Sequence, residues 1–141
     1  MMKKVLALDI GEKRIGIAIS DLLGMMAHPL QTLAFRGIED LSETLNRLVQ
    51  EHDAGCVVVG IPYTMKGTKS KKTEEVLEIV AQLKALLPVE IKEIDERLTT
   101  RMAERDFHAL NKKPSKNRKT IDQIAAVYIL QTYLDKVKVN L

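Results

Sequence analysis

The stretch VLALDIGEKRIGIAISD, residues 5–21, decides the fold. It contains two short β-rich runs, Val5 to Ile10 and Ile15 to Ser20. The four residues between them, Gly11 to Arg14, have the length and glycine content of a hairpin turn. Met25 to Leu33 can supply a third strand, which Pro29 keeps irregular or near an edge of the sheet. The pattern therefore predicts that an antiparallel meander opens the fold.

After the meander, helical and strand patterns alternate. Apolar residues at helical spacing begin at Ile38 and predict a first helix, and the continuous apolar run from Cys56 to Ile61 is typical of a strand buried on both faces of a parallel sheet. A second helix ends before Pro88, and Val89 to Ile94 forms the last strand. We expect a third helix after Thr99 or Thr100 and a fourth from Thr120 to about Leu134.

This order predicts an α/β fold in one domain, residues 1–141. The expected sheet is mixed and five-stranded, with three antiparallel strands followed by two parallel ones, and helices cover both faces. A hydrophobic content of 45% is sufficient for one such core.

Composition and charge exclude several classes of protein. Cys56 is the only cysteine, which excludes a disulfide framework and a thiolate metal site, and we expect it to be a small buried apolar residue. The apolar run after Lys3 and Lys4 is too short for a signal peptide, and no stretch approaches the roughly 20 apolar residues of a membrane span. We therefore expect a cytoplasmic protein without a membrane partner.

Carboxylates follow or interrupt strands at two places and open a helix at a third. Asp9 interrupts the first apolar run, where an uncompensated charge is costly, so it is either a turn-capping residue or a metal ligand. Asp95 and Glu96 end the last strand, where they are either metal ligands or part of an exposed pair with Arg97. Asp122 lies in an apparent capping box that starts at Thr120, yet its spacing places it on the apolar face of the helix.

Two basic segments are candidates for binding phosphate. Lys66 to Lys72 contains four lysines in seven residues, and Lys112 to Lys119 contains five basic residues in eight. Each is either a solvated loop or a surface that attracts a nucleic-acid backbone. Aromatic residues are few, which disfavours base stacking as the main mode of recognition. The three histidines lack metal-ligand spacing, and P-loop, dinucleotide-binding and nucleophile-elbow motifs are all missing from the sequence.

Four motifs, taken together and in this order, resemble the YqgF (RuvX) family. They are LDIGEKRIGIAISD (8–21), VGIP (59–62), DERLTT (95–100) and IDQIAAVYILQ (121–131), and they extend over essentially the whole chain. The resemblance implies a ribonuclease H-like fold related to Holliday junction resolvases. It also implies a nuclease that trims the 5′ end of the small-subunit ribosomal RNA precursor.

The family's acidic positions fall on Asp9, Glu96 with Asp95 beside it, and Asp122. The resemblance implies that these carboxylates are catalytic and hold Mg²⁺ or Mn²⁺, with two ions in the reaction. Basic residues would then position the phosphate backbone of the nucleic acid; the candidates are Arg14, Lys66, Lys69, Arg97, Lys112, Lys113, Lys116, Arg118 and Lys119.

Two departures from the resolvases keep alternatives open. The resolvases carry an acid near the end of the strand beside the first one, where this sequence has Gly60-Ile61-Pro62. They also carry a second acid in the last helix, where this sequence has only Asp122 as a candidate. A junction-cutting DNA endonuclease and a non-catalytic RNA-binding ribosome-assembly factor are the alternatives. Asp9-Ile10-Gly11 also resembles the phosphate loop of sugar kinases, but 141 residues cannot supply their second lobe, so we expect no nucleotide cofactor. A homodimer is a possible assembly.

Overall fold

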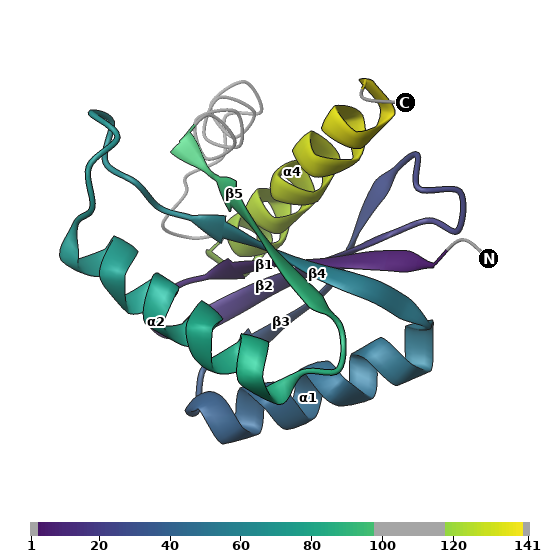
Figure 1. The fold of residues 1–141 in the computed structure, drawn as a ribbon, viewed down its shortest axis with the longest axis horizontal. Coiled ribbons are helices and arrows are strands. Elements are labelled where there is room, and N and C mark those ends of the chain that lie inside the picture. Colours follow the sequence, from purple (N-terminus) through teal and green to yellow (C-terminus); the bar gives the residue numbers. More distant parts are fainter. Residues whose placement is uncertain (1–2, 98–117, 140–141) are drawn as a thin grey trace.

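The computed structural model describes residues 3–97 and 118–139. Five strands in these ranges form one sheet, and three helices pack on it (Figure 1). The elements are β1 (Lys4–Ile10), β2 (Arg14–Ser20), β3 (Ala27–Ala34), α1 (Ile38–His52), β4 (Ala54–Ile61), α2 (Lys71–Leu86), β5 (Glu90–Asp95) and α4 (Arg118–Val139). No helix within the described ranges is both long and apolar enough to cross a membrane.

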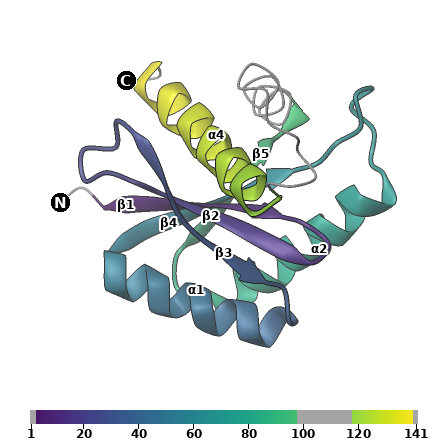
Figure 2. The ribbon, with the colours of Figure 1, turned by 180° about the vertical axis from the view of Figure 1, so that it is seen from behind.

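The sheet is mixed, as the sequence predicts. β1, β2 and β3 are antiparallel neighbours, whereas β4 runs parallel to β1 and β5 runs parallel to β4. The order in space is β3-β2-β1-β4-β5, so the first strand lies at the centre and not at the end that the chain order suggests. Helices α1 and α2 cover one face and α4 covers the other, which the view from behind in Figure 2 also shows.

Alternation along the strands divides the core between the two faces. Leu6, Leu8 and Ile10 of β1 belong to the larger cluster, under α1 and α2, whereas Ala7 belongs to the smaller cluster with α4. The α4 side of the sheet uses small residues, Ala7 and Ala18, which allow the helix to lie close to the strands. This division determines which face each side chain of a candidate site occupies.

Most predicted boundaries agree with the structure within two residues, and the differences are informative. Pro29 lies on the edge strand β3, as predicted, and the pairing of β2 with β3 shifts register between Ile17 and Ala18. Cys56 is half-buried and not fully buried as predicted, whereas every residue of β4 from Val57 to Ile61 is buried. The predicted helix after Thr100 lies outside the described residues.

Two helices begin earlier than the sequence pattern suggests. Lys71 and Lys72 form the first turn of α2, so the predicted lysine loop is shorter than 66–72. Helix α4 begins at Arg118 and ends at Val139, so Thr120 lies inside it and is not its cap. Helices commonly extend beyond the apolar stripe that reveals them, because solvent-facing polar residues form helix equally well.

A side-chain network joins the end of β4 to the start of α2. Ser70 caps α2 by accepting from the Thr73 backbone N–H at 3.2 Å, and the Thr73 hydroxyl accepts from the Ser70 backbone N–H at 3.0 Å. The same hydroxyl donates to the Pro62 carbonyl at 2.6 Å, and Thr73 is fully buried. The first turn of α2 is therefore held at a defined position beside the end of β4.

Thr73→Val should destabilise the protein, because it leaves the Ser70 N–H and the Pro62 carbonyl without their buried partner. We expect a loss of about 1–3 kcal/mol in the free energy of unfolding, measured by urea denaturation. Thr44→Val on α1 is the control and should change stability by less than about 0.5 kcal/mol. Equal stability of the two variants would contradict this account of the connection.

Candidate active site

Three parallel strands end at one edge of the sheet. Strands β1, β4 and β5 all run toward the side from which α2 and α4 start (Figure 1). A tight turn follows β1, in which the Gly11 N–H donates to the Arg14 carbonyl at 2.8 Å. A Cβ atom on Gly11 would lie 2.8 Å from that same oxygen, so the turn requires glycine. Side chains from the strand ends thus converge at this edge.

Asp9 is the penultimate residue of β1 and is half-buried. It pairs with Gly16 on β2, and alternation places it on the α4 face with Ala7. Arg14 lies two residues before Gly16 on β2, so its side chain belongs to the same face. Asp9 therefore does not cap the turn as a surface residue but faces the smaller core.

Glu96 directly follows β5, and its N–H donates to the Ile61 carbonyl at 3.2 Å, which extends the β4–β5 pairing by one bond. Its side chain lies on the α4 face, and the carboxylate atom Oε2 is buried. A side-chain hydrogen bond joins Glu96 to Asp9, although β4 lies between their strands. The structure thus brings together carboxylates from two of the three acidic positions that the sequence singled out.

The proximity of these two acids changes their protonation. Burial, then the charge of Asp9 and the hydrogen bond with Asp9, together raise the pKa of Glu96 to about 8. The positive charge of Lys72 acts the other way. In the absence of a cation, one proton shared by the pair avoids two adjacent buried negative charges.

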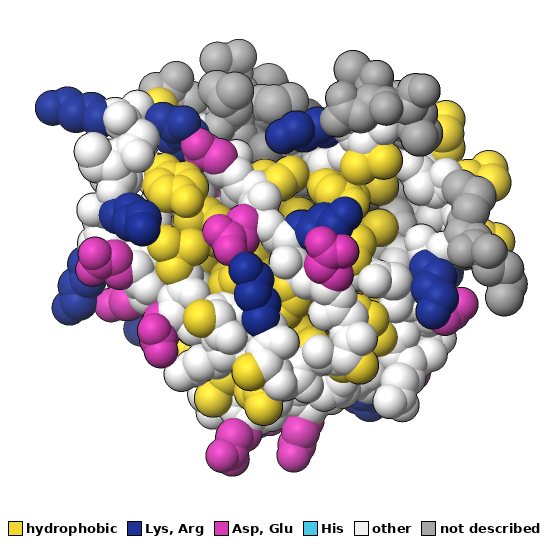
Figure 3. Space-filling model, viewed as in Figure 1, with side chains coloured by type: hydrophobic (Ala, Val, Ile, Leu, Met, Phe, Trp, Pro, Cys, Tyr) yellow, Lys and Arg dark blue, Asp and Glu magenta, His cyan; other side chains and the backbone are white. Residues whose placement is uncertain are grey.

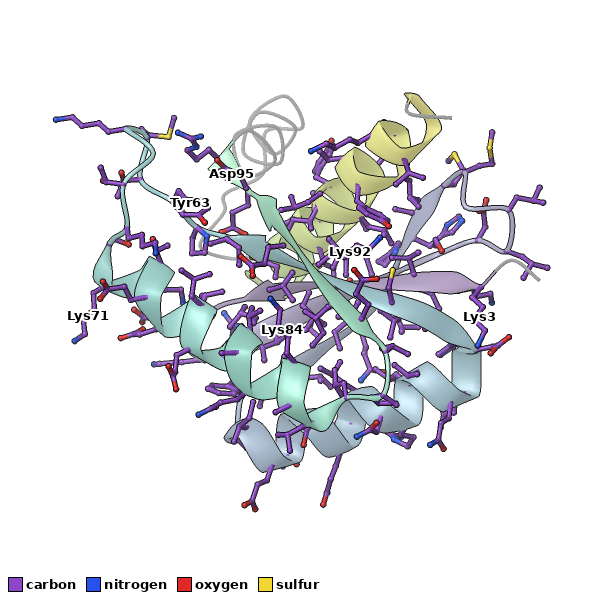
Figure 4. The ribbon with its side chains drawn as sticks, in the orientation of Figure 1. Lys3, Tyr63, Lys71, Lys84, Lys92 and Asp95 are labelled. Atoms are coloured by element: carbon purple, nitrogen blue, oxygen red, sulfur yellow. The ribbon has the colours of Figure 1, made fainter. Side chains whose placement is uncertain are left out.

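Asp95 lies on the other side of the strand end. Its carboxylate accepts from Arg97 Nε at 3.0 and 2.8 Å and from Nη2 at 2.6 Å, and this pairing lowers the pKa of Asp95. Figure 4 shows Asp95 at the same edge as Tyr63 and remote from Lys3. Arg97 Nη1 also donates to the Met65 carbonyl at 3.5 Å. Asp95 is thus engaged with Arg97, whereas Glu96 is the residue that reaches Asp9.

The third predicted carboxylate, Asp122, belongs to the early turns of α4, which begins at the same edge of the sheet (Figure 1). Its side chain lies outside the described part of the structure. Within the described residues, no group of three His, Cys, Asp or Glu side chains is arranged to hold a metal ion. The described pair is therefore Asp9 and Glu96.

The predicted basic residues are spread over several elements. Lys66 and Lys69 are exposed on the loop between β4 and α2, which Arg97 contacts through Met65. Lys112, Lys113 and Lys116, and the side chains of Arg118 and Lys119, are outside the described part. Among the described residues on the face in Figure 3, Lys and Arg side chains are interspersed with Asp and Glu and do not form one basic patch.

Lys72 was absent from the candidates chosen from the sequence, although it lay within a lysine run. It acts electrostatically on Glu96 because the Ser70 cap places it in the first turn of α2. The signal for it is Ser70-x-x-Thr73, a capping box that starts the helix at Lys71, five residues before the apolar stripe begins at Val76. Recognising that cap would have placed Lys72 at the sheet edge.

A hollow of about 490 Å³ adjoins the hairpin turn on the α2 side of the sheet. Its lining includes Ile10, Phe35 and Lys72, together with four glutamates, and it includes neither Asp9 nor Glu96. The glutamates oppose entry of a polyanion, so the hollow is separate from the acidic pair on the α4 face.

The strand order and the two-sided helix cover define a ribonuclease H-like domain. The structure of T. thermophilus RuvC in complex with a Holliday junction substrate matches with a TM-score of 0.56 over 96% of each chain. The junction-bound fowlpox virus resolvase also gives 0.56, over 95% of this chain and 98% of that chain. Sequence identities of 12% and 11% limit both likenesses to the fold.

The chain belongs to the RuvX family, whose model, described as "Holliday junction resolvase", matches residues 3–136. A relative from Fusobacterium nucleatum is 40% identical over 97% of this chain and 100% of its own length. One from Acetivibrio thermocellus is 42% identical over 94% of this chain and 95% of its own. Both carry the name "Putative pre-16S rRNA nuclease".

The raised pKa of Glu96 predicts a stability that depends on pH. Because the folded protein holds this proton up to about pH 8 and an unfolded glutamate loses it near 4.5, the metal-free protein should lose stability between these values. Glu96→Gln removes this effect. In chelator, we expect its Tm to exceed that of the wild type by at least about 4 °C at pH 9, with little difference at pH 5.

Glu90→Gln is the matched control, because Glu90 lies on the same face of the same strand at its opposite end. Its Tm difference from the wild type should be the same at both pH values. If Glu96→Gln behaved like Glu90→Gln, the close contact between Asp9 and Glu96 would be wrong.

Proposed function

We propose that this protein is a metal-dependent nuclease that hydrolyses phosphodiester bonds in processing the 5′ end of pre-16S rRNA. The observation that carries the proposal is the contact between Asp9 and Glu96 at the edge where β1, β4 and β5 end. The substrate follows from the names of relatives about 40% identical over nearly the whole chain.

The acidic pair fits a divalent cation. Two carboxylates are held in contact, one with a buried oxygen and a raised pKa, and a cation could take the place of the proton that they share. Their hard oxygen atoms suit Mg²⁺ or Mn²⁺. Asp9 and Glu96 are the proposed ligands, Asp122 is the proposed third, and the Arg97 pairing makes Asp95 a neighbour that supports the loop. Two bound ions would supply an activated water and stabilise the leaving oxygen.

The basic residues have the separate task of binding the phosphate backbone. Lys66 and Lys69 extend from a loop that Arg97 ties to the end of β5, next to Glu96. Lys72, in the first turn of α2, acts electrostatically on Glu96, and Arg14, at the start of β2 on the same face as Asp9, is a further candidate. The proposed surface continues into the basic segment before α4, with Lys112, Lys113, Lys116, Arg118 and Lys119. A ribosomal RNA substrate implies a cytoplasmic location.

A second candidate substrate is a four-way DNA junction. The description of the family model and the fold match to the junction-bound RuvC favour it. A protein that binds precursor RNA through its lysines without cutting it is the non-enzymatic alternative. The three possibilities differ in which polynucleotide is cut and in whether the carboxylates matter.

Purified protein should be incubated with a pre-16S rRNA fragment and with a four-way junction, each with Mg²⁺, with Mn²⁺ and with chelator. We expect metal-dependent cleavage of the RNA, and a loss on the order of a hundredfold or more in Asp9→Asn and Glu96→Gln, because each removes a proposed ligand. Strand cleavage is measured by gel electrophoresis of end-labelled substrates.

Asp40→Asn on α1 and Glu90→Gln on β5 are the charge-matched controls and should retain activity. Preferential cleavage of the junction would show that the substrate is DNA and not the ribosomal RNA precursor. Binding of RNA without cleavage, unchanged by chelator and by Asp9→Asn, would establish the non-catalytic alternative.

A further inference from the structure

The two carboxylates of the acidic pair come from strands that are not neighbours. β4 separates β1 from β5, and adjacent strands lie about 4.8 Å apart. Leu8 pairs with Val59, which places Asp9 beside Gly60. On the other side Gly60 pairs with Ile94, and Glu96, two residues further along on the same face, brings its Oε2 over Gly60. A side chain at this position would project from the α4 face of the sheet, into the space between the two acids.

Gly60 is buried, and the space above it is already occupied. A Cβ atom added there would lie 2.5 Å from Glu96 Oε2, 2.5 Å from Ile129 Cδ1 and 3.1 Å from Ile129 Cγ1. The atoms it would meet are ends of side chains and not backbone. The backbone of Gly60 is not in the left-handed region either, because its φ is not positive. A side chain at this position would therefore have to displace Glu96 and Ile129.

We propose that Gly60 is a positioning residue: its missing side chain opens a gap in β4 through which the Glu96 carboxylate reaches Asp9. The acid from β5 thereby occupies the volume that a side chain on β4 would fill, and Ile129 of α4 closes that volume from the opposite layer. The inference rests on the proposed metal-dependent function, and it concerns how that site is assembled.

The proposal separates two consequences of Gly60→Ala. The new methyl group displaces Ile129, which costs packing, and it displaces the Glu96 carboxylate, which costs metal binding. Ile129→Val removes the Cδ1 atom, so only the longer 3.1 Å contact with Cγ1 remains on the Ile129 side, and the conflict with Glu96 is unchanged. Gly60→Ala/Ile129→Val should therefore fold nearly as well as Ile129→Val, yet bind Mn²⁺ at least about tenfold more weakly. Electron paramagnetic resonance of free Mn²⁺ measures the affinity.

A stability cycle tests the contact without any metal. In chelator, the decrease in Tm caused by Gly60→Ala should be smaller in an Ile129→Val/Glu96→Ala background than in Ile129→Val alone, because the displaced carboxylate is gone. This background also provides room if Gly60→Ala fails to fold by itself. Gly55→Ala is the control, since Gly55 is on the same strand and its added Cβ would lie 2.9 Å from Lys3 Cβ, so its penalty should not depend on Glu96.

The outcomes distinguish this inference from the proposed function. Mn²⁺ affinity in Gly60→Ala/Ile129→Val within twofold of that in Ile129→Val would overturn the role of Gly60, as would a Gly60→Ala penalty that is independent of Glu96. If the wild type neither binds Mn²⁺ nor cleaves nucleic acid, the proposed function fails, and the stability cycle alone still decides whether Gly60 makes room for Glu96.

Discussion

The contact between the carboxylates of Asp9 and Glu96 is the constraint on which the site depends. It joins side chains from two strands across a third, and it holds like charges together in a partly buried place, which opposes folding unless a proton or a cation is present. The rest of the domain supplies the rigidity that keeps this contact. Fully buried residues of β1 and β4 lie under α1 and α2 on one face, and α4 closes the other.

The residues around the acidic pair place basic side chains near it. Arg97 holds Asp95 and contacts the loop that carries Lys66 and Lys69, so the acid beside Glu96 is used to place a basic loop. The Ser70 and Thr73 network places Lys72 near Glu96. Positive groups thus lie around the acids without neutralising them, an arrangement suited to a phosphate that approaches a bound cation.

The sequence predicted the architecture well because alternation and helical spacing report directly on burial. The hairpin at Gly11, the edge position of Pro29 and the parallel β4 could all be read from local patterns. The central position of β1 could not, because strand order depends on crossovers that no local pattern records. Alternation along β5 places Asp95 and Glu96 on opposite faces of the sheet, but applying it required knowing that the strand extends to Asp95. The role of Gly60 depends on contacts between β4, the residue after β5 and α4, which no spacing reveals.

The central claim is that Asp9 and Glu96 form one cation site. The most direct measurement is a crystal structure with Mn²⁺, in which anomalous scattering locates the ion. The account predicts a peak within about 2.0–2.6 Å of carboxylate oxygens from both residues. The claim would be contradicted if, at saturating Mn²⁺, the peak lay elsewhere and Asp9 and Glu96 still shared a hydrogen bond.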